Sequence, residues 1–253
     1  MSKKTELKPT TQDQVIGATN PNLPFFYIDE WKESPPTNLL FAGPSGTGKT
    51  TAAIVIAAEL NYTMNEFNAS DERGIDFIRS RIKTLCETSG LWNKRLILLD
   101  EADGLTKQAQ EALRRIMENT DAIFILTCNN ISSIIPALQS RCTKFTFKRY
   151  DSDDVRAYLQ LLDKQWSSPN YFSTQAEAHD ADELSIHFAG DLRAIQKHVI
   201  SGMPLSQDST EFDVAAMQIA AGDWESLHRT LRMMIDDGVT LHGLMHRIHE
   251  HVL

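Results

Sequence analysis

A glycine-rich string that carries one lysine and several hydroxyl groups has the clearest chemistry in the sequence. It reads Gly43-Pro44-Ser45-Gly46-Thr47-Gly48-Lys49-Thr50, is followed by Thr51, and matches the pattern GxxxxGK[ST] in full. In such a loop the backbone N–H groups curl round phosphates, and glycine tolerates the backbone angles that this close approach demands. Lys49 would neutralise phosphate charge and the Thr50 hydroxyl would ligate Mg²⁺. The string therefore predicts a nucleotide site with ATP and Mg²⁺ as cofactors.

Two adjacent acids close an apolar run further along the chain. Leu96-Ile97-Leu98-Leu99 leads directly into Asp100 and Glu101. Asp100 at the tip of a strand is expected to hold Mg²⁺ through oxygen contacts, because Mg²⁺ prefers oxygen ligands. Glu101 is then placed to polarise the attacking water. A solvated acidic turn is the alternative for this pair alone, but it is a poor account of acids that follow a complete phosphate loop.

A third apolar run ends on amides, and an isolated arginine follows it. Asn129 comes after the run 122–127 and is expected to hydrogen-bond the γ-phosphate or the attacking water. Arg141 lies in the string Ser140-Arg141-Cys142, far along the chain from the phosphate loop. Such an arginine suits a finger supplied to the nucleotide of a neighbouring subunit, acting in trans. A surface salt bridge is the alternative for Arg141.

Short buried strands that alternate with helices must position these groups. The runs 38–42, 95–100 and 122–127 read as buried strands, and the segments 50–60, 75–88 and 106–119 read as helices. This alternation predicts an α/β fold with a parallel sheet covered by helices on both faces. Chemistry in such sheets lies at the carboxyl ends of the strands, where the three polar groups fall.

The second half of the chain has a different pattern. No buried strand is expected after about residue 150, and 151–165 and 181–200 read as amphipathic helices. The break Ser201-Gly202-Met203-Pro204 precedes further helical segments. We therefore expect a nucleotide-binding core over 1–150, a helical lid over 151–202 and a partial, truncated all-helical collar over 203–253.

Composition sets broad limits on the class of protein. The net charge is -9, which argues against a protein that coats nucleic acid with its whole surface but allows a local basic stripe. The three cysteines have no CxxC spacing, so neither a disulfide framework nor a zinc site is expected. No apolar run reaches the length that crosses a bilayer. A cytoplasmic protein without membrane contact is expected, nucleoid-associated in a prokaryote or virus and nuclear in a eukaryote.

Several strings together resemble the replication factor C small subunit, an AAA+ sliding-clamp loader, of an archaeal or archaeal-virus type. They are Leu39–Thr51, Asn68–Ile75 (NASDERGI), Leu98–Asp103 (LLDEAD), Ala112–Glu118 (ALRRIME), Leu138–Cys142 (LQSRC) and Gly190–Arg193 (GDLR). The resemblance covers nearly the whole chain, and the NASDERG and SRC strings are much narrower than a general AAA+ signature.

The resemblance implies an ATPase that helps open a sliding clamp and close it round primer–template DNA. Its partners would be other clamp-loader subunits in a ring-like pentamer, the clamp and the DNA. By position, Asn129 is similar to the first sensor, Arg193 to a second sensor on the lid, and Arg141 to the finger. Val15 and Ile16 fall where the family wraps the adenine. The chain stops short of the usual family length, so it is either a compact relative or an incomplete sequence.

Basic side chains form a candidate DNA contact. Arg79 and Lys83 are spaced i,i+4 on a predicted helix, with Arg81 nearby. In the family this helix tracks the DNA backbone, which gives affinity without sequence readout; a solvated basic face is the alternative. Arg114 and Arg115 lie on the next helix, and by analogy one of them could restrain Glu101 until DNA arrives.

Two other functions remain as alternatives at this point. A nucleotide-binding scaffold subunit of the same complex would not need Lys49, Thr50, Asp100 and Glu101 together. Another AAA+ DNA motor, such as a branch-migration helicase, should lack the SRC string and carry a strand-rich winged helix at its C-terminus.

Overall fold

The computed structural model describes residues 9–71, 73–87, 94–165, 181–201 and 224–236. The chain divides into two compact units, Met1–Lys148 and Arg149–Leu253.

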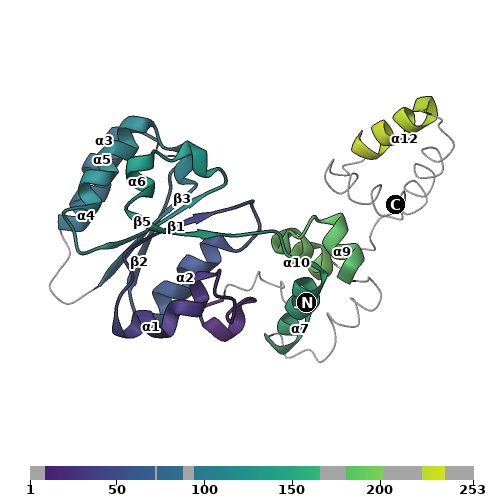
Figure 1. The fold of residues 1–253 in the computed structure, drawn as a ribbon, viewed down its shortest axis with the longest axis horizontal. Coiled ribbons are helices and arrows are strands. Elements are labelled where there is room, and N and C mark those ends of the chain that lie inside the picture. Colours follow the sequence, from purple (N-terminus) through teal and green to yellow (C-terminus); the bar gives the residue numbers. More distant parts are fainter. Residues whose placement is uncertain (1–8, 72, 88–93, 166–180, 202–223, 237–253) are drawn as a thin grey trace. The chain divides into compact units, whose positions relative to one another are not determined.

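The first unit is built on a five-stranded sheet in which the strands follow the order β2-β3-β4-β1-β5 and every neighbouring pair is parallel (Figure 1). The strands are β1 (Asn38–Ala42), β2 (Thr63–Asn68), β3 (Arg95–Asp100), β4 (Ile123–Cys128) and β5 (Cys142–Thr146). Because all the strands point the same way, the sheet has a carboxyl edge, where every strand ends, and an amino edge, where every strand begins.

Apolar side chains alternate along the central strands and bury against opposite faces of the sheet. On β1, Leu39 and Phe41 contact one hydrophobic cluster, whereas Leu40 and Ala42 contact the other. A strand turns successive side chains to opposite faces, so a continuous apolar run fills two cores at once. β4 is buried along its whole length, as a strand covered on both faces should be.

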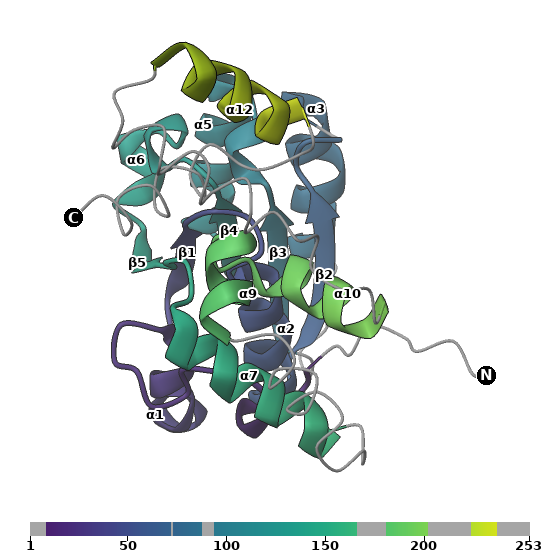
Figure 2. The same cartoon turned by 90° about the vertical axis from the view of Figure 1, so that its right-hand side faces the viewer.

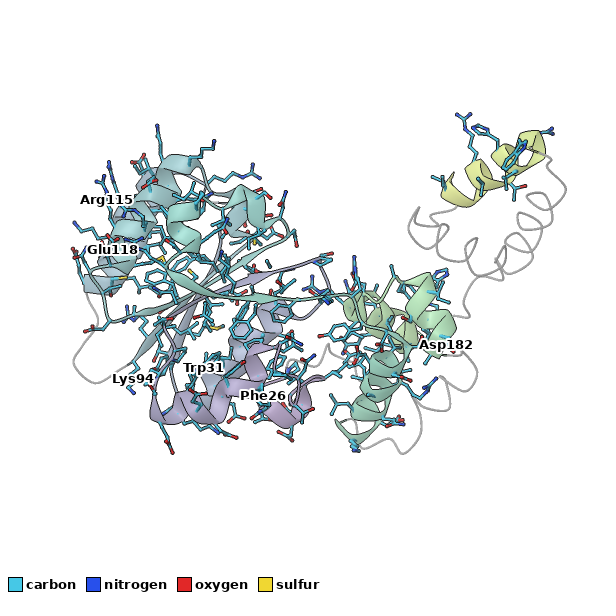
Figure 3. The ribbon with its side chains drawn as sticks, in the orientation of Figure 1. Phe26, Trp31, Lys94, Arg115, Glu118 and Asp182 are labelled. Atoms are coloured by element: carbon cyan, nitrogen blue, oxygen red, sulfur yellow. The ribbon has the colours of Figure 1, made fainter. Side chains whose placement is uncertain are left out.

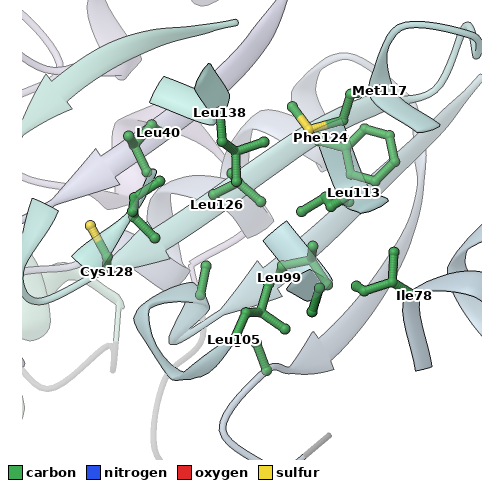
Figure 4. Close-up of a cluster of buried hydrophobic side chains, with 14 of the residues drawn as sticks. Leu40, Ile78, Leu99, Leu105, Leu113, Met117, Phe124, Leu126, Cys128 and Leu138 are labelled. Atoms are coloured by element: carbon green, nitrogen blue, oxygen red, sulfur yellow. The ribbon is translucent and has the colours of Figure 1, made fainter. Parts of the chain in front are cut away.

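Two groups of helices cover the two faces. One face packs against α1 (Ile28–Glu33) and α2 (Lys49–Glu59). The other packs against a continuous helical stretch and two further helices (Figure 1; Figure 4 shows this core). They are α3 (Ile75–Phe77), the π-helical turn Ile78–Ile82, α4 (Lys83–Glu87), α5 (Lys107–Met117) and α6 (Pro136–Gln139).

Helix α5 spans the height of the sheet. It follows β3, so it begins near the carboxyl edge at the capping residue Thr106, whose hydroxyl accepts a hydrogen bond from Ala109 N. Its chain then runs back toward the amino edge, where Glu118 ends it. Apolar residues at helical spacing, including Leu113 and Met117, seat it on the core.

The second unit is helical where it is described. Its helices are α7 (Ser152–Gln165), α9 (Ala181–His187), α10 (Leu192–Ser201) and α12 (Trp224–Asp236). α7 packs against α9 (Figure 2). Gly190 has φ of +65°, and a Cβ there would lie 2.3 Å from the Tyr150 carbonyl oxygen, so the turn before α10 closes tightly on the start of the unit.

The expected α/β fold with a parallel sheet is confirmed, and the three strands expected at 38–42, 95–100 and 122–127 are β1, β3 and β4. Sequence reasoning missed β2 and β5. Both are outermost strands of the sheet and are largely exposed, so neither carries the apolar run that marks a central strand. The lid over 151–202 and the collar over 203–253 stay predictions; most of the collar range lies outside the described residues.

Candidate functional site

The phosphate loop lies between β1 and α2, at the carboxyl edge. Gly46 and Gly48 have φ of +74° and +89°, in the left-handed region that side chains disfavour. Gly43 has φ of +153°, and a Cβ on it would lie 2.2 Å from the Phe147 carbonyl oxygen. The glycines of the string are thus required by backbone angle at three positions, which is the geometry of a loop whose N–H groups can face phosphate.

Lys49 is the hub of this loop. Its side chain is buried, and Nζ donates to the carbonyl oxygens of Gly43 and Pro44, each at 2.7 Å, and to Asn129 Oδ1 at 3.1 Å. Asn129 follows β4, the strand beside β1. The structure therefore brings the lysine of the first motif against the amide expected to be a sensor.

The rest of the loop follows the same pattern. Thr47 is buried, and its hydroxyl donates to the Pro44 carbonyl oxygen at 2.8 Å, which fixes the turn of the loop. Ser45 is exposed, and Thr51 lies in the first turn of α2. The first turn of α2 follows the loop directly, so its N–H groups lie at the same end of the sheet as the loop.

Asp100 and Thr50 meet at the ends of β3 and α2. Thr50 Oγ1 donates to the two carboxylate oxygens of Asp100 at 3.0 and 3.2 Å. A hydroxyl and a carboxylate in contact beside a phosphate loop form an all-oxygen donor set of the kind that Mg²⁺ takes. The residues present therefore fit the expected cation.

Thr127 links the acidic pair, and sequence reasoning did not single it out. Its hydroxyl donates to Asp100 Oδ1 and accepts from the backbone N–H of Glu101 at 3.0 Å. Leu99 pairs with Leu126 in the sheet, so the residues one step further on, Asp100 and Thr127, lie side by side. A polar residue next to the end of an apolar strand was the available signal.

Glu101 adopts a backbone conformation that is rare for a residue with a side chain. Its φ and ψ are +54° and +44°, in the left-handed region, and the residue is exposed at the carboxyl edge. Such a conformation costs energy and persists where the surroundings fix it, often at functional sites. Here the Thr127 hydroxyl fixes the Glu101 N–H.

Asp103 organises the loop after β4. Its Oδ2 accepts from the N–H groups of Asn129 and Asn130 at 3.2 and 3.4 Å. Burial, with Asp103 adding negative charge, raises the pKa of the Cys128 thiol to about 11, and Lys49 opposes that rise. Asp103 therefore positions Asn129 through its backbone N–H group, a role that the place of Asp103 in the acidic string did not reveal.

Gln110, also missed by sequence reasoning, joins α5 to the segment after β4. It is buried, and its Nε2 donates to the carbonyl oxygens of Leu105 and Ser133 at 3.1 and 3.0 Å, while Oε1 accepts from Ile135 N at 2.8 Å. All three partners are backbone groups. A polar residue on the buried face of a helix was the only sequence signal.

Arg141 lies at the opposite edge of the sheet from the phosphate loop. It immediately precedes β5, whose first residue Cys142 pairs with Asn38, the first residue of β1. The phosphate loop begins after the last residue of the five-residue strand β1. At about 3.3 Å per strand residue, roughly 16 Å of sheet separates the level of Arg141 from the loop. The Arg141 side chain therefore does not reach the phosphate loop of the same chain.

The basic residues lie on exposed helical surfaces. Arg79, Arg81 and Lys83 are exposed on the π-helical turn and the start of α4; Arg81 lies over the Phe67 ring at 5.9 Å, and Lys83 pairs with Glu87 at 3.6 Å. On α5, Arg115 is exposed, whereas Arg114 pairs with two glutamates of its own helix (Figure 3 shows Arg115). The structure pairs Arg114 with these glutamates and gives neither arginine a contact with Glu101.

The remaining candidates lie in two places. Val15 packs on the core cluster of the α2 face, and Ile16 follows it, half-buried. Arg193 lies in the first turn of α10 in the second unit. The Asp191 side chain accepts from the N–H groups of Arg193 and Ala194, each at 3.0 Å, and so caps that helix.

In the part of the chain that the structure describes, no helix is both long and apolar enough to cross a bilayer.

Comparison with known proteins identifies the family. Residues 39–150 match the family described as ATPase family associated with various cellular activities (AAA). A replication factor C small subunit of Haloarcula marismortui is 33% identical over 272 residues, which is 97% of this chain and 80% of the relative. One of Halobacterium salinarum is 38% identical over 232 residues, 82% of this chain and 68% of the relative. One of Staphylothermus marinus is 49% identical over 143 residues, 53% of this chain and 44% of the relative. This chain is therefore an AAA ATPase that belongs to the replication factor C small subunit family of DNA-replication clamp loaders.

Proposed function

We propose that this chain uses ATP hydrolysis to help open a sliding clamp and load it on primer–template DNA. It works in an oligomer with other clamp-loader subunits. The family supports the setting, and the arrangement of the two sheet edges supports the division of labour. The carboxyl edge binds and cleaves the subunit's own ATP, and the amino edge acts on the nucleotide of a neighbour.

The nucleotide is bound by residues 43–51, with Val15 and Ile16 against the adenine. Lys49 already lies among loop carbonyl groups and Asn129, so its ammonium group is held at the mouth of the loop by 2.7 and 3.1 Å contacts. An ammonium group has three N–H donors, so a phosphate oxygen would take the place of one of these three acceptors. Backbone N–H groups of the loop and of the α2 amino end supply the remaining contacts.

Thr50 and Asp100 hold Mg²⁺. A cation held by these two residues would supply positive charge beside the phosphates. The chain's contribution is to keep the hydroxyl and the carboxylate together, and Thr127 does this from the other side of Asp100. Because Thr127 also holds the Glu101 N–H, the same hydroxyl sets the distance between the cation ligand and the catalytic acid.

Glu101 orients the attacking water and takes up its proton. The exposed side chain projects from a left-handed residue at the end of β3, one step from Asp100. Asn129 is the first sensor and orients the γ-phosphate or the water from the neighbouring strand. Arg193, capped into the first turn of α10 by Asp191, is the second sensor.

Arg141 is the finger that stabilises charge on the γ-phosphoryl group of a neighbouring subunit. An arginine finger supplied in trans makes hydrolysis conditional on assembly. The observation that carries this proposal is the placement of Arg141 at the amino edge, about 16 Å of strand away from its own phosphate loop.

Contacts with DNA are assigned to Arg79, Arg81, Lys83, Arg114 and Arg115. They lie on the helices of one face of the sheet, in a protein whose net charge is -9. A few basic groups on one surface suffice for phosphate contacts, which carry no sequence information.

Steady-state ATP turnover tests the proposal. The full chain is assayed alone, then with its cognate clamp and primer–template DNA, and then with both in the Arg141→Ala variant. We expect clamp and DNA together to raise turnover well above the basal rate and Arg141→Ala to abolish the rise. Turnover that stays flat while ATP still binds would instead favour a nucleotide-binding scaffold.

A further inference from the structure

Four charged side chains of alternating sign are linked in a series that starts in the middle of α5 and ends on the residue before β5. Arg114 Nε lies 3.3 Å from Glu111 Oε2, and Arg114 Nη1 lies 3.1 Å from Glu118 Oε1. The same Glu118 oxygen is in ion-pair contact with Arg141 Nη2. This series, Glu111–Arg114–Glu118–Arg141, ends on the residue assigned as the finger (Figure 3 shows Glu118).

Glu118 is placed to hold Arg141 without using up its donors. Arg141 donates through Nη2 to Glu118 and through Nη1 to the Ala137 carbonyl oxygen at 3.1 Å. A guanidinium carries five N–H donors in a fixed plane, so further N–H groups stay available to a phosphate. The carboxylate and the carbonyl thus each hold one terminal nitrogen of the guanidinium.

The contacts at Arg141 are only partly shielded from water. The Arg141 side chain is 33% exposed and the Glu118 side chain 34% exposed. An exposed arginine otherwise samples many rotamers, and each one that points away from the neighbour's phosphate is unproductive. Two anchors, one charged and one a backbone carbonyl, restrict that sampling.

We propose that Glu118 is a positioning residue for Arg141, fixing the finger for its action on the neighbouring subunit. The proposal rests on the finger role of Arg141. Arg114 shares the Glu118 oxygen and so moderates the hold on Arg141. Nothing in the proposal requires Glu118 to touch the nucleotide.

Glu118→Gln and its matched control Glu111→Gln test this directly. Both substitutions remove a carboxylate partner of Arg114 from the same helix, but only Glu118 reaches Arg141. In the full assembly with clamp and primer–template DNA, we expect Glu118→Gln to lower kcat about tenfold, the scale on which loss of an orienting partner acts. The KM for ATP should stay unchanged, because the nucleotide is bound by the other edge.

The double variant distinguishes positioning from general damage. If Glu118 acts through Arg141, then Glu118→Gln adds no further loss in the Arg141→Ala background. Glu111→Gln should leave kcat within about twofold, since exposed ion pairs contribute little. Thermal unfolding of each variant shows whether it is folded.

The outcomes separate the two proposals. If Arg141→Ala leaves turnover unchanged, the finger role itself is wrong. If Arg141→Ala lowers turnover but folded Glu118→Gln does not, or if the two losses multiply in the double variant, the positioning role of Glu118 is overturned while the finger role stands.

Discussion

The two edges of the same sheet organise their charged groups in different ways. At the carboxyl edge, Lys49, Thr50 and Asp100 are held by backbone carbonyls, short hydroxyl side chains and the ends of strands. At the amino edge, Arg141 is held by one backbone carbonyl and by the long, partly exposed side chain of Glu118. Rigid elements place groups more closely than flexible side chains do. The carboxyl edge is thus preorganised by the fold, whereas the amino edge depends on a chain of ion pairs.

The largest expected effect separates the edges by their part in binding. Lys49→Met removes a buried ammonium from the phosphate loop, and we expect the dissociation constant for ATP to rise by about a hundredfold, since losing such a charged contact costs about 3 kcal/mol. Arg141→Ala should leave ATP binding by the same chain unchanged, because Arg141 lies at the other edge. Equilibrium binding of a fluorescent ATP analogue measures both. Equal losses would contradict the separation of the edges.

A second change removes the hydrogen bonds that attach helix α5, which runs between the two edges, to the segment after β4. Gln110→Leu places an apolar side chain where a buried amide hydrogen-bonds three backbone groups, and we expect the loss of these three bonds to lower the free energy of unfolding by about 3 kcal/mol. Gln108→Leu is the matched control, since Gln108 is exposed on the same helix. Urea unfolding followed by circular dichroism compares them. A Gln110 variant as stable as the Gln108 variant would show that α5 does not need this attachment.

A third, smaller change tests how tightly the carboxyl edge is set. Thr127→Val keeps the side-chain shape but removes the hydroxyl that joins Asp100 to the Glu101 N–H, so we expect a loss of about 1.5 kcal/mol in stability and a lower kcat. Thr143→Val on the edge strand β5, where the residue is exposed, is the control. Turnover and urea unfolding are measured on both. If kcat is the same in the two variants, Thr127 does not position the acidic pair.

The smallest expected effect is on the pH dependence of stability. It involves Cys128 at the carboxyl edge and Cys142 at the amino edge. Burial raises the pKa of Cys128 to about 11 and that of Cys142 to about 12, from 9.0 for an ordinary thiol. A thiol whose pKa is raised in the folded state contributes its full share of stability below about pH 9, the pKa of the unfolded thiol. That contribution is lost as the pH rises through the pKa of the folded state. We therefore expect the free energy of unfolding to decrease above about pH 9.

Alanine variants of the two cysteines measure their shares of that decrease. Burial also raises the pKa of Cys86 and Tyr62, and both groups remain in either variant. Urea unfolding between pH 8 and pH 11 should show a shallower decrease for Cys128→Ala and for Cys142→Ala than for the unaltered chain. An unchanged slope in both variants would show that these thiols do not ionise on unfolding.

Sequence reasoning predicted the centre of the fold better than its margins. β1, β3 and β4 are buried on both faces, so their apolar runs are unbroken, whereas the edge strands β2 and β5 are mixed in character. An outermost strand is exposed to solvent and does not need an apolar run. Its pairing with a neighbouring strand cannot be read from its own residues. For this reason β2 and β5 were not predicted from the sequence.

The residues of the candidate site likewise divide into those that sequence reasoning found and those that it missed. The contacts of Lys49 with Asn129 and of Thr50 with Asp100 join groups that contiguous motifs had already marked. Thr127, Gln110 and Glu118 act through partners distant in sequence, and their roles depend on strand register or on the direction of α5. For Thr127 and Gln110 the only local signal is a polar side chain in an apolar setting, and the partners of all three residues cannot be identified until the fold is known.

The close approach at Gly43 has a consequence for genetic suppression. A methyl group there would collide with the main-chain oxygen of Phe147, and Phe147 N–H is itself bonded to the Ala42 carbonyl oxygen at 2.7 Å. Since the obstacle is backbone rather than a side chain, trimming a neighbouring residue does not make room for the methyl group. A defect caused by substituting Gly43 would therefore be relieved by reversion to glycine, and second-site changes of side chains would not restore it.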